Sequence, residues 1–460
     1  MANIPPEIWF HIAKFIPKED LRDLLEVNSI FFNIAMDIRY REVVISTRTT
    51  DQHMKTFKQL RCVSFDSVDT QYSVLDLQRF DSSDPLVASR VHRLSLRLTY
   101  IKKASTSGSN IRNQLKHTIV HMFGGPKSPR ARTINVPPTD LINEIINIAS
   151  NLVNVRELYI DLWDLPPLYD LQPLFSSFWS SFGPKLHTLS LCGILEDFRT
   201  LINSNPPLDG LQELRVEFTL SCLDGIELGR AILIDILLPF INSLAPHLSS
   251  LRLWSWASLD LSTFFSQLPP FPGLKTLNVR THFNQAFGDA SGLKDLICNN
   301  SDTLRRVDLR LNPAGLTVNP STEEPLSLWL LECISDERFF SQLQVLDIYP
   351  TNMAAGMEFL LNCIQRTSKN LVELIVRDRY LQSREVKAVI DAATSCSNLT
   401  YLKMNIRTLD VALTDRLALK LPRIGQLWLS IAENDFNDPN YVCIRQNMSP
   451  GISTNNCSGL

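Results

Sequence analysis

The stretch Leu248-Ser249-Ser250-Leu251-Arg252-Leu253 carries the spacing that decides the fold, because the same pattern, L-x-x-L-x-L, recurs along most of the chain. Other apolar residues replace leucine in several copies. The further copies are residues 91–96, 155–160, 186–191, 211–216, 274–279, 304–309, 343–348, 371–376, 399–404 and 424–429. From residue 158 to residue 427, successive copies lie about 30 residues apart on average, and a short motif at a near-regular period indicates repeated structural units.

Amphipathic helical stretches lie between the copies, the clearest at residues 140–149, 231–244, 357–364 and 385–393. Leucine-rich repeats combine such a motif with a helix in units of 20–29 residues, so this version is long and irregular. Strand–loop–helix units repeated in line predict an α/β fold, a curved leucine-rich-repeat-like solenoid with a parallel inner sheet and outer helices.

The pattern also predicts the register of the strands. The first apolar residue of each L-x-L should lie beside its counterparts in one parallel sheet, buried between strands and helices. These residues are Leu158, Leu189, Leu214, Leu251, Leu277, Val307, Leu346, Leu374, Leu402 and Leu427.

Side chains alternate along a strand, so the residue inside each L-x-L and the residue after it face away from the core. In the middle of the array this face is basic and aromatic, a composition typical of binding hot spots. We expect it to bind an acidic or phosphorylated segment of a protein substrate, because arginine pairs bidentately with carboxylate or phosphate. The predicted contact residues are Arg252, Trp254, Arg280, Arg310, Tyr349 and Arg377.

An alternative for the same arginines stays open. Asp308 and Asp347 lie on the same face and could neutralise the arginines in a ladder across neighbouring strands.

The first 45 residues predict three short amphipathic helices. Their apolar stripes are Ile8, Ile12 and Phe15, then Leu21, Leu24 and Leu25, then Ile30, Phe31, Ile34 and Ile38. So small a helical unit cannot bury its apolar faces alone and usually needs a partner, a metal or disulfides. The segment has no cysteine and a single histidine, so a protein partner is expected.

Four elements of this segment, in order, resemble the F-box. Their sequences look most like the fungal branch of that family. They are Ile4-Pro5-Pro6-Glu7-Ile8, Asp20-Leu21, Val27-Asn28-x-x-Phe31 and Arg39-Tyr40-Arg41. Ile4 stands where the family usually has leucine, and Phe31 where it usually has tryptophan. A small helical cap on the solenoid is the alternative interpretation.

The resemblance implies a substrate-recognition adaptor of an SCF-type cullin-RING ubiquitin ligase. In that arrangement the F-box docks on the linker subunit, which joins it to the cullin, and the repeat domain holds the protein to be ubiquitylated. Catalysis would reside in other subunits, so the chain is not expected to be an enzyme. The residues implied in linker binding are Pro5, Ile8, Ile12, Leu21, Val27 and Phe31.

The expected domains are an F-box module at 1–46, a solenoid at 47–445 and a disordered polar tail at 446–460. Within the solenoid, residues 102–132 contain seven Lys or Arg and no Asp or Glu. We interpret this segment as a surface insertion rather than a nucleic-acid-binding arm, because aromatic residues do not alternate with the basic ones.

Composition and motifs narrow the function further. The net charge of −3 creates no general attraction to nucleic acid or to a membrane surface. No signal peptide is apparent and the nine cysteines form no C-x-x-C pair, so a cytoplasmic and/or nuclear location is expected. His117 and His121 have the spacing of metal ligands on a helix, but the glutamate of a zinc-protease motif is missing between them. No motif in the chain requires a cofactor. A repeat scaffold acting outside the ubiquitin system remains the main alternative, and an enzyme on a repeat scaffold would need a polar cluster in a pocket.

Overall fold

The computed structural model describes residues 5–17, 20–22, 24, 29–46, 88–97, 138–163, 170–204, 206–220, 225–257, 259–282, 288–311, 320–348 and 354–432. The basic segment 102–132, the tail 446–460, Val27 and Tyr349 lie outside these residues. The chain divides into two compact units, residues 1–193 with 200–210, and residues 194–199 with 211–460.

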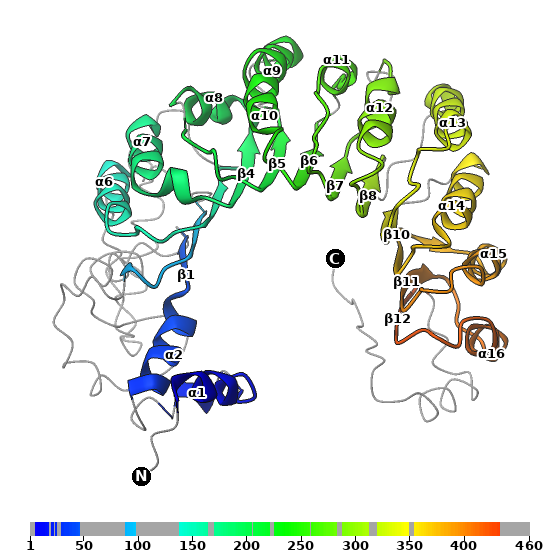
Figure 1. Ribbon diagram of the computed structural model, residues 1–460. Helices are drawn as coiled ribbons and strands as arrows, with labels where there is room; N and C mark the ends of the chain where they lie inside the picture. Colours follow the sequence, from blue (N-terminus) through cyan, green and yellow to red (C-terminus); the bar gives the residue numbers. More distant parts are fainter. Residues whose placement is uncertain are drawn as a thin grey trace, which may run out of the picture. The chain divides into compact units, whose positions relative to one another are not determined.

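The first unit begins with helical segments and continues with parallel strands (Figure 1). Its elements are α1 (Pro6–Ala13), the 3-10 turn η1 (Asp20–Arg22), α2 (Ser29–Tyr40), β1 (Glu42–Ser46), β2 (Arg93–Arg97), α6 (Pro138–Ala149), β3 (Glu157–Asp161), α7 (Gln172–Phe182), the 3-10 turn η3 (Gly183–Lys185) and β4 (Thr188–Ile194). Strands β1 to β4 pair in chain order, all in parallel. Helix α8 (Leu195–Asn203) follows β4.

The described residues of the N-terminal segment form two of the three predicted helices. Between them, residues 20–22 form a 3-10 turn, and the amides of Asp20 and Leu21 both donate to the carbonyl of Pro17. Residues 18–19, 23 and 25–28, which belong to the predicted middle helix and the link after it, lie outside the described residues. Strand β1 pairs with β2, so the last residues of the expected module lie in the sheet. Residues 42–46 contain no L-x-x-L-x-L motif from which this strand could be predicted.

In the described part of the second unit, strands and helices alternate from β5 to β12. Its elements are β5 (Glu213–Thr219), α9 (Gly225–Ile232), the π-helical turn η4 (Leu233–Leu237), α10 (Leu238–Leu244), β6 (Ser250–Ser255), α11 (Ser262–Ser266), β7 (Thr276–Arg280), α12 (Ser291–Asn299), β8 (Arg306–Arg310), α13 (Pro320–Ser335), β9 (Val345–Ile348), α14 (Ala354–Thr367), β10 (Glu373–Leu381), α15 (Ser383–Ala393), β11 (Tyr401–Ile406), α16 (Val411–Lys420) and β12 (Gln426–Ile431). The strands line one side of the unit and the helices the other (Figure 1). This confirms an α/β array of parallel strands with helices covering one face.

The predicted register is confirmed within each unit. Leu158 lies beside Leu189 in the first unit. In the second unit, seven consecutive pairings join the predicted residues from β5 to β12. Both apolar residues of each L-x-L up to β11 are buried, which places the core between strands and helices.

One repeated hydrogen-bond pattern holds this register. The carbonyl two residues before each buried leucine accepts two amides of the next repeat, as when Ser249 accepts from Lys275 at 2.8 Å and Thr276 at 3.1 Å. Lys275 accepts from the next repeat in the same way, and so on to Thr400. A slip by one residue would break these bonds and turn the leucines away from the helices.

The prediction of burial is wrong for Leu427, which is only half-buried. It lies in β12, the last strand of the described chain, which pairs only with β11. A terminal repeat has a neighbour on one side only, so its apolar residues lose half of their packing.

Truncating the same residue type at the centre and at the end of the array should therefore give different costs. Leu277→Ala removes a side chain that is 1% exposed and should lower the free energy of unfolding by about 2–5 kcal/mol. Leu427→Ala should cost less than half as much as Leu277→Ala. Urea or thermal denaturation of the full chain measures both, and equal losses would contradict this account of the array.

Candidate functional site

The candidate site lies on the side of the strands opposite the helices. In β6, Leu251, Leu253 and Ser255 are buried, whereas Arg252 and Trp254 are partly exposed. The parallel register extends this alternation to the neighbouring strands, so residues from several repeats form one surface. We refer to this surface of β5 to β10 as the polar strand face.

Two buried carboxylates occupy its centre. Asp308 and Asp347 are direct register partners on β8 and β9, and only 5% and 2% of their surfaces are exposed. Arg310 donates from Nε to Asp308 at 3.1 Å. Arg377 donates from Nε to Asp347 at 2.9 Å and reaches Asp308 with a terminal nitrogen at 3.2 Å, which joins the two carboxylates.

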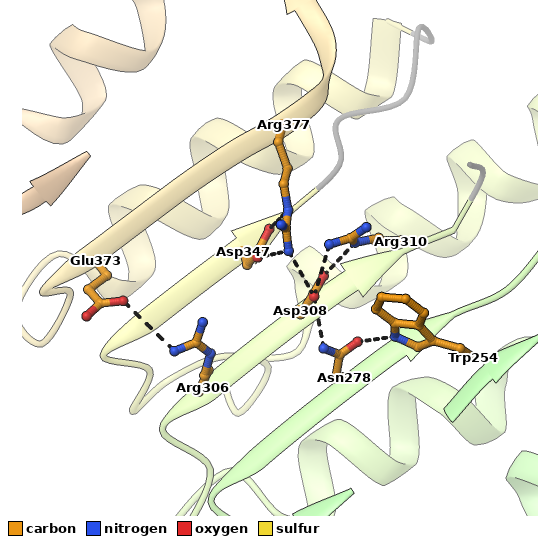
Figure 2. A network of polar contacts seen from close by, with 8 residues as sticks. All are labelled: Trp254, Asn278, Arg306, Asp308, Arg310, Asp347, Glu373 and Arg377. Atoms are coloured by element: carbon orange, nitrogen blue, oxygen red, sulfur yellow. Dashed lines mark hydrogen bonds and ion pairs between the residues drawn. The ribbon is translucent and has the colours of Figure 1, made fainter. Parts of the chain in front are cut away.

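Hydrogen bonds extend this network towards β6 (Figure 2). Asn278 donates its amide to Asp308 at 2.9 Å, and its oxygen accepts the indole N–H of Trp254. The ring of Trp254 is thereby fixed from its edge. Arg306 and Glu373, at 4.0 Å and more exposed, add a peripheral ion pair of little energetic weight.

Burial, together with the neighbouring charge of Asp308, raises the pKa of the Asp347 carboxyl to about 6. Arg377 and Arg310 oppose these effects without cancelling them. Removing an arginine from this buried network would leave a carboxylate without its compensating charge, so the two aspartates depend on Arg310 and Arg377.

Tryptophan and arginine side chains gather beside the carboxylates, at the ends of β6 and β7. The guanidinium carbon of Arg280 lies 3.5 Å from the ring centre of Trp256 and 5.6 Å from that of Trp254. Arg252 and Arg310 also lie against Trp254, at 4.9 and 5.2 Å. We refer to Arg252, Trp254, Trp256 and Arg280 as the arginine–tryptophan cluster.

The structure brings together five of the six residues predicted to contact a substrate, and the sixth, Tyr349, lies outside the described residues. For Arg310 and Arg377 the alternative holds, because Asp308 and Asp347 neutralise them. Trp256 was not predicted to belong to the site. Its position, two residues after Trp254 and therefore on the same side of the strand, was the signal that could have identified it.

The residues predicted to bind a linker subunit fall into two groups. Pro5, Ile8 and Ile12 are exposed, with 49% of Ile8 and 38% of Ile12 accessible. Leu21 and Phe31 are buried in a small core with Ala13 and Ile34, and Phe31 meets the ring of Trp9 edge-on at 5.2 Å. Val27 lies outside the described residues.

Two kinds of feature are absent from the described residues. In this part of the chain, no group of three His, Cys, Asp or Glu side chains is arranged to hold a metal ion. None of the helices described combines the length and apolarity needed to cross a bilayer.

Comparison with known proteins adds little to this description. No protein-family model matches the sequence, and no curated protein matches it. Among solved structures, the leucine-rich repeat-containing protein LegL7 from Legionella pneumophila aligns with 64% of this chain and 88% of its own, at 14% identity and a TM-score of 0.37. The complex of Rad7 and Elc1 in yeast contains a chain that aligns with 97% of this chain over 95% of its own length, at 15% identity and a TM-score of 0.39.

A third structure, the complex of TLR13 with ssRNA13, aligns with 62% of this chain and 43% of its own, at 15% identity and a TM-score of 0.26. All three TM-scores are below 0.5, so neither the fold nor the function is inferred from these similarities. The fold assignment rests on the strand register and the burial pattern.

The raised pKa of Asp347 predicts a pH-dependent effect of Asp347→Asn. At pH values between 3.8, the ordinary pKa of an aspartate, and about 6, Asp347 is protonated in the folded chain but ionised in the unfolded chain. Above pH 6 it must be ionised in the folded chain as well, and this ionisation lowers the free energy of unfolding. Asp347→Asn should therefore stabilise the protein at pH 7.5, on the order of 1–3 kcal/mol. This advantage should shrink towards zero as the pH falls to about 4.5.

Thermal unfolding of wild type and variant at several pH values measures this difference. Glu373→Gln is the control, because its carboxylate lies on the same face but is half-exposed. A loss of stability from Asp347→Asn at pH 7.5, unchanged at low pH, would contradict the description of the carboxylate pair.

Proposed function

We propose that the protein is a non-catalytic substrate-recognition adaptor of an SCF-type cullin-RING ubiquitin ligase. Its N-terminal helices would dock on the linker subunit, and its repeat array would hold the protein to be ubiquitylated. The observation that carries the proposal is the surface of α1, in the segment whose sequence resembles the F-box.

Helix α1 and the turn that follows it have apolar residues on two neighbouring stripes. Trp9, Ala13 and Ile16 pack on the core formed with α2 and η1. Ile8, Ile12 and Phe15 repeat at the same spacing on the next stripe and are exposed, Phe15 by 78%. A helix that is apolar around most of its circumference is usually buried on more than one side, so the second stripe suits a protein partner.

The predicted linker-binding residues would then contribute in two ways. Ile8 and Ile12 would contact the linker subunit directly. Leu21 and Phe31, buried within the chain, would hold α1 against α2 and so present the exposed stripe. Loss of Phe31 would weaken docking by disordering the helices rather than by removing a contact.

The repeat array supports the other half of the proposal. Its strands present a broad polar face on which arginine and tryptophan side chains lie beside one another. A bound substrate would be held close to the charged conjugating enzyme, which raises the effective concentration of its lysines. No cofactor is required for this role, and a cytoplasmic and/or nuclear location is compatible with it.

Replacing two exposed apolar residues of α1 with charged ones tests the docking step. The double variant Ile8→Glu, Ile12→Glu should lose the linker subunit and the cullin by at least tenfold on co-purification, because the charges would have to be buried in the interface. The full chain should keep its melting temperature, because both side chains are exposed.

Leu419→Glu is the matched control, because Leu419 is 78% exposed on α16 in the other unit. It should retain both partners. If the wild-type chain captures neither linker nor cullin, the adaptor proposal is wrong. Capture of the linker alone would favour a scaffold acting outside the ubiquitin system.

A further inference from the structure

The arginine–tryptophan cluster is formed by two short sequences that the register brings together. Trp254 and Trp256 lie two residues apart at the end of β6, and Arg280 is the register partner of Trp254 on β7. Its guanidinium stacks on Trp256, which is 41% exposed. The cluster therefore combines exposed aromatic surface with oriented cations.

The carboxylates around the cluster already have other partners. Glu213 pairs with Arg215 at 2.7 Å, and Glu217 accepts the indole N–H of Trp256 at 2.6 Å. Asp308 accepts from Asn278 and from two other arginines. The acidic groups of the face are thus committed to donors other than Arg252.

Arg252 makes no hydrogen bond or ion pair with any residue that the structure describes, and its guanidinium lies over the ring of Trp254. Burial and the nearby charge of Arg215 lower its pKa, so its positive charge is unfavourably placed in the unbound protein. An anion bound beside Arg252 would relieve both effects and occupy its bidentate donors.

We propose that Arg252 and Arg280 bind the phosphate of a phosphorylated side chain on a protein partner, with a flanking residue of that partner packed on the exposed part of Trp256. This inference rests on the proposed function, because it names the chemical class of the substrate. A phosphate carries close to two negative charges and three acceptor oxygens, enough for two guanidinium groups. Arginine is also the residue that most often recognises phosphate through paired hydrogen bonds.

A peptide fits this face better than a nucleic acid. A polyanion following the strands would meet Glu213, Glu217, Asp308, Asp347 and Glu373 on the same face. Base stacking requires open aromatic rings, whereas arginines lie over Trp254 and its indole N–H is held by Asn278. One isolated phosphate covers a smaller part of the face and therefore meets fewer of these carboxylates than a polyanion does.

The test uses the full-length protein and three immobilised peptide pools. The pools are degenerate and identical except for a central phosphoserine, serine or glutamate. Wild type should bind the phosphoserine pool at least tenfold more tightly than the other two, and higher ionic strength should weaken this binding. Equal binding to the three pools, or equal binding to phosphoserine and glutamate, overturns the proposal.

Two variants locate the binding. The double variant Arg252→Gln, Arg280→Gln should abolish the preference for phosphoserine, whereas Arg384→Gln, Lys387→Gln on the exposed surface of α15 should keep it. If the first variant fails to fold, Trp256→Ala at its exposed position should still weaken phosphoserine binding by threefold or more. Full retention of the preference by folded variants of the cluster overturns the proposal.

Two further experiments distinguish phosphopeptide binding from nucleic-acid binding, and the phosphate site from the ligase assignment. A single-stranded oligouridylate that displaces the phosphoserine pool at lower concentration than free phosphopeptide overturns the proposal in favour of nucleic acid. Ile8→Glu, Ile12→Glu should bind the phosphoserine pool like wild type. Phosphoserine binding by a chain that captures no linker upholds this site and contradicts only the ligase assignment, whereas linker capture without any phosphoserine preference contradicts only this site.

Discussion

The structure depends on burying two apolar side chains of each strand from β2 to β11 against the helices. Each L-x-L fixes which side of its strand faces the core, and the paired hydrogen bonds to the carbonyl before each strand fix its position beside the next. Once the core-facing side and the register of a strand are fixed, the residue between the two leucines must point away from the core, because side chains alternate along a strand. Arg252, Asn278, Asp308 and Asp347 lie in one row because the leucines do.

This constraint places two carboxylates side by side, and the arginines of the polar strand face offset their repulsion. Asp308 and Asp347 are neighbours on adjacent strands and are nearly inaccessible to water, so each needs arginine donors. Arg377 serves both carboxylates and Arg310 serves one, which uses those two cations within the protein. The arginine–tryptophan cluster lies at the edge of this network, where the internal carboxylates are already satisfied. The face is thus divided into a structural part and a part suited to an external anion.

The register and the burial of the strands could be predicted because both follow from alternation and a repeated spacing. Leu427 deviated because a last repeat has only one neighbour, which spacing does not encode. The pairing of arginines with aspartates could be stated only as an alternative, since an arginine side chain can reach either neighbouring strand and a sequence does not fix its direction. In the N-terminal segment, the apolar spacing identified only the stripe of Ile8, Ile12 and Phe15 on the first helix. The residues that pack within the chain are Trp9, Ala13 and Ile16.

Site-specific photocrosslinking tests the central claim most directly, that the strand face at β6 and β7 receives a phosphorylated protein partner. A photoreactive phenylalanine analogue would replace Trp256, and in a separate chain Lys387 on α15, in cells that express the full-length protein. The account predicts a crosslinked protein at position 256 whose yield falls sharply when extracts are treated with phosphatase before irradiation, and none at position 387. Equal crosslinking at both positions, or crosslinking at 256 that phosphatase leaves unchanged, would contradict it.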